Sequence, residues 1–179
     1  AKSGDTLFLS YSGHGSTCLD VNNDDLNGFD QTIISSDLKA IKDDDLKDII
    51  DAYLKPGVTL FGLFDSCYSG SVLDLRYQHL DSLKNNNLTI NTKETETKGN
   101  VIMISGCTDF QTSEDAYING TFNGAMTWAF SNCIKSTKKI SWQTLINNMR
   151  TLLKKNNYPQ IPQLSSGKFL DINTIVFSN

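Results

Sequence analysis

The segment Val58–Gly70, VTLFGLFDSCYSG, decides the fold class of this 179-residue chain. Its apolar residues run almost without interruption to Phe64, and polar and small residues follow at once. An apolar run of this length is typical of a strand that is covered on both faces of a parallel sheet. The same pattern occurs at Thr6–Gly15, TLFLSYSGHG. We therefore expect two parallel strands, each of which ends in a loop of small residues.

The remaining periodicity predicts an α/β protein. Apolar residues repeat at i, i+3, i+4 and i+7 and predict helices over residues 43–54, 124–134 and 141–154. Apolar runs at 101–104 and 174–177 predict two further strands. Strands that alternate with helices indicate a largely parallel sheet flanked by helices.

The length predicts one domain, since a domain has about 150 residues. The segment 77–99 is rich in Asn, Thr, Lys and Glu and contains few apolar residues, so we expect an exposed linker there. This linker would separate an N-terminal region, 1–76, from a C-terminal region, 100–179. Residues 158–168, YPQIPQLSSGK, predict an ordered surface loop fixed by two prolines.

Charge and cysteine content exclude several classes of protein. The formal net charge is −4 and no basic run is present, which argues against nucleic acid or an anionic membrane as the main partner. No apolar run reaches the ~18 residues of a membrane span, and no signal peptide opens the chain. The four cysteines show no paired metal-site spacing. We therefore expect free thiols in a reducing compartment, the cytoplasm.

Two residues with catalytic chemistry follow the two expected parallel strands. His14 comes after the first and Cys67 after the second. Because sites form at the carboxyl ends of parallel strands, a base and a nucleophile would meet there. The backbone N–H groups of Gly15 and Cys67 are candidate donors to a developing oxyanion. Taken singly, a Cys after a strand is usually a small buried residue, and a His beside glycines is often a turn residue. We interpret His79, in the linker, as solvated.

The motifs Ser12–Gly15 and Asp65–Gly70 resemble the His and Cys boxes of metacaspases, which are caspase-like cysteine peptidases. Three later segments follow in the order of that family: 105–115 (SGCTDFQTSED), 124–130 (GAMTWAF) and 162–166 (PQLSS). The resemblance implies a caspase-type three-layer α/β sandwich with a mostly parallel central sheet. Nearly the whole chain outside the linker takes part.

The resemblance also implies residue roles. His14 would be the general base and Cys67 the nucleophile of an endopeptidase that cleaves polypeptides after Arg or Lys. Asp65 and Ser12 would form the acidic pocket for that basic side chain, and a partly buried carboxylate does favour a cation. The alternative for Asp65 is a structural one, in which its carboxylate caps the turn after the strand.

Calcium is the cofactor that the resemblance implies, as an activator. The implied ligands are Asp30, Asp43, Asp44 and Asp74, and calcium takes six to eight oxygen ligands. Asp43 and Asp44 can equally be acids that favour a helix N-terminus. An EF-hand does not fit residues 20–31, because Asp stands where that loop requires Gly, and Gln where it requires Glu.

Two departures from the family pattern affect these expectations. Tyr68 stands where metacaspases commonly have His after the catalytic Cys. The His-box strand begins at residue 6, although a caspase-type sheet has two strands before it. We expect a monomer that is incomplete or completed by another segment, because the missing strands would leave an unpaired sheet edge. The alternative function is that of a truncated or inactive module in binding or aggregate association.

Self-processing is a further expectation. The linker carries Lys84, Lys93 and Lys98, and Arg76 lies at its start. Long polar segments are where proteolytic nicking concentrates. We expect cleavage within 76–98 by the peptidase itself.

Overall fold

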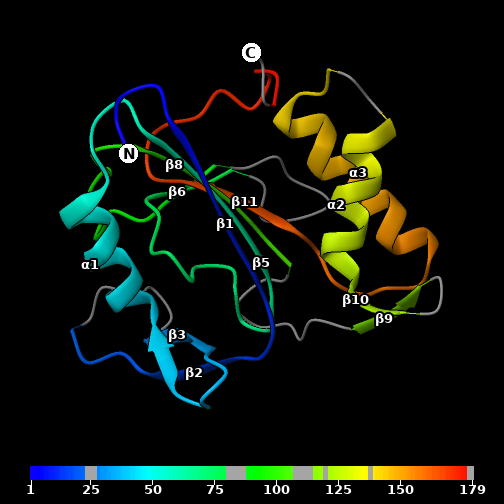
Figure 1. Cartoon of the computed structure of the whole chain (residues 1–179), viewed down its shortest axis with the longest axis horizontal. Coiled ribbons are helices and arrows are strands. Elements are labelled where there is room, and N and C mark those ends of the chain that lie inside the picture. The colour runs from blue at the N-terminus through cyan, green and yellow to red at the C-terminus, as the bar shows by residue number, and fades with distance from the viewer. Residues whose placement is uncertain (23–27, 80–87, 107–114, 119–120, 137–138, 177–179) are drawn as a thin grey trace.

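Three parallel strands form the centre of the fold in a computed structural model, which describes residues 1–22, 28–79, 88–106, 115–118, 121–136 and 139–176 (Figure 1). They belong to a six-stranded mixed sheet of order β1-β5-β8-β11-β6-β7. β1 pairs in parallel with β5, and β5 with β8; β11, β6 and β7 continue the sheet through antiparallel pairs. The strands are β1 Thr6–Ser12, β5 Thr59–Asp65, β6 Tyr77–Gln78, β7 Thr89–Ile90, β8 Asn100–Ser105 and β11 Gln163–Ser166.

Helices cover both sides of this sheet. α1 (Asp43–Tyr53) lies on one side, and α2 (Ala125–Ser136) and α3 (Trp142–Lys155) lie together on the other (Figure 1). The expected helices are confirmed. Ser141 caps α3, since its side chain accepts a hydrogen bond from the backbone N–H of Thr144. The expected α/β architecture with parallel central strands is therefore confirmed.

The alternation of side chains along β5 builds two separate cores. Phe61 and Leu63 pack with α2 and α3, whereas Leu60 and Phe64 pack with residues of α1 and of the segment after Cys67. Successive side chains of a strand point to opposite faces, so one buried strand supports both layers. This explains why the apolar run of β5 is continuous.

Two small antiparallel sheets lie outside the central one. β2 (Gly15–Leu19), β3 (Phe29–Ile34) and β4 (Ala40–Lys42) form the first, which joins the end of β1 to the start of α1. β9 (Asp115–Ile118) and β10 (Thr121–Gly124) form the second, directly before α2. The first sheet matters for the site, because its central strand β3 carries Asp30.

The segment 77–99 differs from the exposed linker that the composition predicts. β6 and β7 lie in it and extend the central sheet, while His79, Glu94 and Thr97 are each less than 10% exposed. The prediction that His79 is solvated is therefore wrong. Its ring packs near Tyr77 and Phe169, and its Nε2 lies 2.6 Å from Ser166 Oγ.

The last strand of the sheet also lies elsewhere than predicted. β11 falls inside 158–168, the expected surface loop, and its four residues are buried. No strand forms at 174–176, where Ile175 makes only an isolated bridge with Ser141, and residue 177 lies outside the described residues. The hydrophobic pattern did not predict this strand, because β11 contains polar residues such as Ser165 and Ser166. Its neighbours in the sheet bury it, and not its own hydrophobicity.

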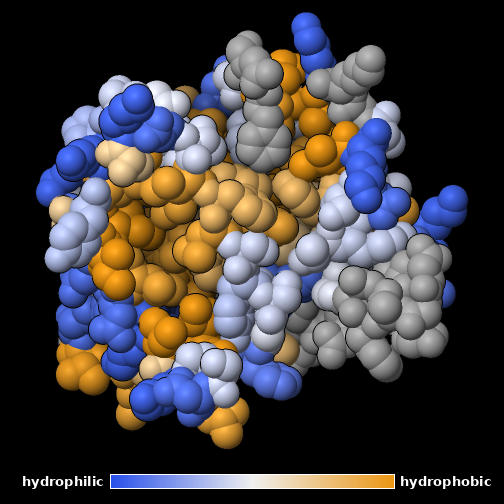
Figure 2. All heavy atoms as spheres, viewed as in Figure 1, coloured by the Kyte–Doolittle hydropathy of each residue, from blue (hydrophilic) through white to orange (hydrophobic). Residues whose placement is uncertain are grey.

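β1 is an edge strand and is not covered as its apolar sequence predicts. Leu7, Phe8 and Leu9 are 41%, 61% and 38% exposed. Figure 2, drawn from the same side as Figure 1, shows hydrophobic side chains gathered across the middle of the face where β1 runs. Among the residues that the structure describes, no strand pairs with the outer edge of β1, as expected. Among the described helices, none has the length and hydropathy needed to cross a membrane.

Candidate active site

The register of β1 and β5 brings the motifs that contain His14 and Cys67 to one edge of the sheet. Ser12 and Asp65 are paired residues at the ends of the two strands, and the N–H of Gly13 donates to the carbonyl of Asp65 at 3.3 Å. His14 is exposed in the loop after β1, and Cys67 is half-buried in the loop after β5. The sequence-based expectation that the two loops lie side by side is confirmed.

Gly15 is the residue at which the two loops touch. A Cβ atom built on Gly15 would lie 1.9 Å from the carbonyl oxygen of Cys67, so only glycine fits there. The backbone of the His14 loop therefore lies directly against that of Cys67. The oxyanion role of the Gly15 and Cys67 N–H groups stays a prediction.

Tyr11 holds the His14 loop in place, and the sequence did not single it out. Its hydroxyl lies 2.8 Å from the carbonyl oxygen of His14 and accepts a hydrogen bond from the N–H of Ile34 at 3.1 Å. The N–H of Ile34 also donates to the carbonyl of His14. A Cβ on Gly13 would lie 2.6 Å from the Tyr11 hydroxyl, which explains the glycine before His14. The only sequence signal was a tyrosine two residues before a glycine.

Asp65 is 4% exposed and has a structural partner. Its Oδ2 accepts a hydrogen bond from the N–H of Thr127 at 2.8 Å, in the first turn of α2. Gly124 and Gly106 make room for the carboxylate, since Cβ atoms there would lie 2.0 and 3.1 Å from its oxygens. The carboxylate thus satisfies a donor at a helix N-terminus, where negative charge is favourable. Ser12, the other expected pocket residue, is exposed beside it.

The loop after Cys67 contains backbone in the left-handed region. Tyr68 has φ 52° and Asp74 has φ 44°. Such angles are uncommon for residues other than glycine and tend to occur at functional sites. The hydroxyl of Ser69 donates to the carbonyl of Ser66 at 2.9 Å, so the loop is also fixed by its own side chains. Tyr68 therefore takes part in the shape of the loop that presents Cys67.

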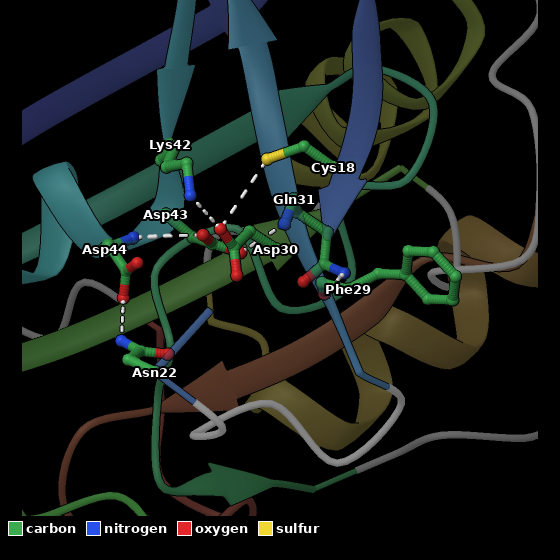
Figure 3. Close-up of polar contacts among 8 residues, drawn as sticks. All are labelled: Cys18, Asn22, Phe29, Asp30, Gln31, Lys42, Asp43 and Asp44. Atoms are coloured by element: carbon green, nitrogen blue, oxygen red, sulfur yellow. Dashed lines mark hydrogen bonds and ion pairs between the residues drawn. The ribbon is translucent and has the colours of Figure 1, made fainter. Parts of the chain in front are cut away.

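Three of the four expected calcium ligands lie together. Asp30, Asp43 and Asp44, here called the carboxylate cluster, each place an oxygen within 4.8 Å of the others (Figure 3). Asp30 and Asp43 are 1% exposed. Asp74 is buried as well but is not a member of this group, so the expected four-carboxylate set is not assembled. The cluster lies where β3 meets the start of α1, and the expected N-terminal acids of α1 belong to it.

Positive and polar groups surround the carboxylate cluster. Lys42 forms an ion pair with Asp30, which raises the pKa of the lysine. Burial raises the pKa of Asp43 to about 7, although the N–H groups of Gln31 and Asp44 donate to its carboxylate and oppose the shift. Cys18 Sγ lies 3.6 Å from Asp30 Oδ2 (Figure 3). Burial raises the pKa of this thiol, so it stays a thiol at neutral pH.

The carboxylate cluster fits a hard cation. Oδ1 of Asp30 is buried and has no hydrogen-bond partner among the described residues. An unpaired buried carboxylate oxygen is costly, and a bound cation would satisfy it. The donor set consists of carboxylate oxygens, which calcium and magnesium prefer.

Some of the expected residues lie outside the described part of the chain. Cys107 and most of the 105–115 motif are among them. The three cysteines that the structure does describe are free thiols: Cys18, Cys67 and Cys133. Cys133, on α2, is buried in the hydrophobic core as expected.

Comparison with solved structures supports the fold. The chain is similar to protein GSU0716 from Geobacter sulfurreducens, whose crystal structure it matches with a TM-score of 0.63. The match covers 94% of this chain and 68% of that one, at 24% sequence identity. At this identity the likeness bears on the fold alone.

Comparison of sequences identifies the family. Residues 1–76 match the model of the metacaspase, peptidase C14 domain. The chain is 36% identical to Metacaspase-1A of Neurospora crassa and 35% identical to Metacaspase-1 of Emericella nidulans, over 98% of its own length in both cases. It spans about half the length of these curated relatives, 49% and 54%. With the His and Cys boxes at adjoining strand ends, these matches show that the chain belongs to the metacaspase family.

Proposed function

We propose that this chain is a cysteine endopeptidase that cleaves polypeptides after Arg or Lys and is activated by calcium. The observation that carries the proposal is the adjacency of the His14 and Cys67 loops at the ends of two paired parallel strands. Family membership supports the reaction class. The free thiols of Cys18, Cys67 and Cys133 support a reducing compartment, the cytoplasm.

His14 and Cys67 divide the chemistry between them. His14 takes the proton of the Cys67 thiol, and the thiolate attacks the carbonyl carbon of the scissile bond. The N–H groups of Gly15 and Cys67 donate to the resulting oxyanion. His14 then gives its proton to the departing amine, which leaves a thioester. Water, deprotonated by His14, attacks the thioester, and the carboxylic acid product and the free thiol are released.

Asp65 supplies the preference for a basic side chain. Its carboxylate lies at the strand end next to Cys67 and is almost fully buried. In such a place a negative charge attracts Arg or Lys more strongly than it would in water. The hydrogen bond from Thr127 fixes the carboxylate without neutralising it. Ser12, exposed beside it, would line the entrance.

The carboxylate cluster would hold the calcium ion. Asp30, Asp43 and Asp44 offer the oxygens, and backbone carbonyls or waters would complete the six to eight ligands. When bound, calcium supplies positive charge that offsets three crowded carboxylates, and it takes no part in bond making. Magnesium should substitute poorly, because it requires a smaller octahedral cage.

Two measurements test the proposal. Hydrolysis of an Arg-terminated fluorogenic peptide should depend on calcium and should be abolished in Cys67→Ala and nearly so in His14→Ala. The double variant should be no worse than either single variant, because residues that act as one unit are not additive. Full activity in Cys67→Ala would remove the nucleophile assignment.

The calcium site is tested by isothermal titration. Replacement of both Asp43 and Asp44 by Ala should weaken calcium binding by more than about tenfold, a loss of at least about 1.4 kcal/mol. Asp45→Ala, in the same first turn of α1, is the matched control and should bind as the wild type does. Wild-type affinity in the double variant would mean that the metal lies elsewhere and that the acids only favour the helix N-terminus.

A second candidate function is binding of extended or aggregated polypeptide at the edge of β1. The exposed Leu7, Phe8 and Leu9 favour it, because an apolar edge strand is a template for another strand. In this case the Cys67→Ala chain would bind aggregates as the wild type does. Phe8→Lys would abolish that binding and leave peptide hydrolysis intact.

A further inference from the structure

The buried residue Gln31 touches both the carboxylate cluster and the loop that carries Cys67. Its backbone N–H donates to the carboxylate of Asp43, and its side-chain carbonyl accepts a hydrogen bond from the hydroxyl of Ser71. Gln31 lies next to Asp30 on β3, and Ser71 lies four residues after Cys67. One side chain therefore joins segments 40 residues apart in the sequence.

The orientation of the Gln31 amide is fixed by a third contact. Nε2 donates to the carbonyl oxygen of Phe29 at 2.8 Å (Figure 3). This leaves Oε1 to accept from the hydroxyl of Ser71. An amide can satisfy a carbonyl acceptor only with its nitrogen, so the two ends of the group cannot exchange. Gln31 is 0% exposed, and close-packed surroundings leave such a side chain little freedom to move alone.

We propose that Gln31 is a positioning residue that transmits the state of the carboxylate cluster to the Cys67 loop. The inference rests on the proposed function, in which the cluster binds a cation and Cys67 is the nucleophile. Two of the three carboxylates are linked to Gln31 without an intervening residue. Asp30 precedes Gln31 in β3, and Asp43 accepts the hydrogen bond from the backbone N–H of Gln31. A shift of these carboxylates that accompanies cation binding moves Gln31, and Gln31 moves Ser71.

The loop that receives this shift is short and internally bonded. The N–H of Asp74 donates to the carbonyl of Ser71 at 2.7 Å, and the hydroxyl of Ser69 bonds to the carbonyl of Ser66. A displacement at Ser71 is therefore passed to the backbone around Cys67 and not absorbed by a flexible segment. A separate observation indicates that a ligand binds in the carboxylate cluster: the buried Oδ1 atom of Asp30 has no hydrogen-bond partner among the described residues.

Two variants separate the relay from the cation site itself. Gln31→Met keeps the length of the side chain and removes the amide, and Ser71→Ala removes only the hydroxyl. For each, calcium affinity is measured by titration, and the rate of Cys67 alkylation by iodoacetamide is followed by peptide mass spectrometry with and without calcium. In the wild type calcium should change this rate. In both variants the change should fall by about tenfold, within the usual range of coupling between sites, while calcium still binds.

Matched controls distinguish positioning from general damage. Gln143→Met on α3 and Ser36→Ala in the exposed turn after β3 should respond to calcium as the wild type does. Ser71→Thr retains the hydroxyl and should restore the response. Because coupling between binding equilibria is reciprocal, attachment of an arginyl chloromethyl ketone to Cys67 should tighten calcium binding in the wild type, and should not do so in Gln31→Met.

The outcomes are distinct. Unchanged calcium acceleration of alkylation in both Gln31→Met and Ser71→Ala overturns the inference and leaves the proposed function standing. A wild-type chain that binds no calcium overturns the proposed function and the inference together. Loss of the response in both variants, with calcium affinity retained and with Ser71→Thr restored, supports the inference.

Discussion

The loop that carries His14 depends on a hydroxyl outside the motif. Tyr11 contacts the carbonyl of His14 and the N–H of Ile34, and both bonds hold the loop against β3. Tyr11→Phe should lower kcat about fivefold, which corresponds to about 1 kcal/mol for a lost hydrogen bond. KM should not change, because this hydroxyl orients the loop and not the substrate.

The control for this variant is Tyr53→Phe, which removes an exposed hydroxyl on α1. Steady-state kinetics on an Arg-terminated peptide gives both constants. A raised KM at constant kcat in Tyr11→Phe would contradict a positioning role.

Asp65 gives a prediction about specificity. Asp65→Asn removes the charge but keeps an oxygen that can accept from Thr127, so the melting temperature should change little. The preference for Arg over Gln before the cleaved bond should fall by about 2–5 kcal/mol if the ion pair with substrate is desolvated. Competition between two peptides that differ only in this residue measures it. An unchanged preference would mean that the basic pocket is built from other residues.

The sequence predicted well that His14 and Cys67 lie in adjoining loops, and it predicted poorly which residues support those loops. His14 and Cys67 could be found because each follows an apolar strand and lies in a motif. Tyr11 and Gln31 could not, because their roles depend on contacts with Ile34, Asp43 and Ser71 that the fold creates. Asp74 illustrates the opposite failure, since the resemblance named it as a ligand and the structure does not group it with the other three carboxylates.

At the scale of elements, β6 and β11 are held together partly by a buried histidine. The backbone N–H of His79 donates to the carbonyl of Leu164 at 2.8 Å, and the imidazole ring of His79 contacts the hydroxyl of Ser166. Burial lowers the pKa of His79 from 6.5 to about 4. Between these values the unfolded chain binds a proton that the folded chain does not, so the free energy of unfolding falls as pH falls from 6.5 towards 4.

The expected size of this effect follows from the shift. A slope of about 1.4 kcal/mol per pH unit accumulates to about 2–3 kcal/mol at pH 4, and the contribution levels off below that pH. Urea unfolding of the wild type and of His79→Gln between pH 4 and pH 7 measures it. The variant should lose that part of the slope, and parallel curves would show that the histidine remains accessible to protons.

Elements could be predicted where their own residues are apolar and regular. α1, α3 and β5 fall where periodicity places them, because a helix or strand buried through its own side chains shows this in its sequence. β11 and β6 could not be predicted in this way. Their residues are largely polar, and they form strands only through pairing within the sheet. β11 pairs with β8, and β6 then pairs with β11. β1 shows the converse, since its apolar sequence suggests cover on both faces and the structure leaves it at an edge.

At the scale of the whole molecule, cleavage between the two regions is the testable event. Of the basic residues in 76–98 that the structure describes, Lys93 and Lys98 are exposed and Arg76 is half-buried. The Arg76 side chain also donates to the carbonyl of Glu94. Lys84 lies outside the described residues. We expect calcium to trigger cleavage within this window, at an exposed lysine before the half-buried Arg76. Mass spectrometry of the incubated chain identifies the cut.

The control is the Cys67→Ala chain, which should stay intact under the same conditions. Cuts only outside 76–98, or none in a sample that hydrolyses peptide, would contradict the expectation. After cleavage the fragments should elute together in gel filtration, because the central sheet contains strands from both.

The order of the strands gives such a cut a lasting effect. β8 and β11, from the C-terminal region, lie between β5, from the N-terminal region, and β6, from the start of the segment 77–99. In the uncut chain both of the ladders that join them form within one molecule. After a cut between β6 and β8, the same ladders join two molecules, and refolding becomes a second-order reaction whose rate falls with dilution. The cut protein then keeps its structure only because it unfolds slowly, since the separated fragments refold slowly. A brief heat pulse at low concentration should therefore abolish the activity of the cut form, whereas the uncut form refolds and keeps its activity.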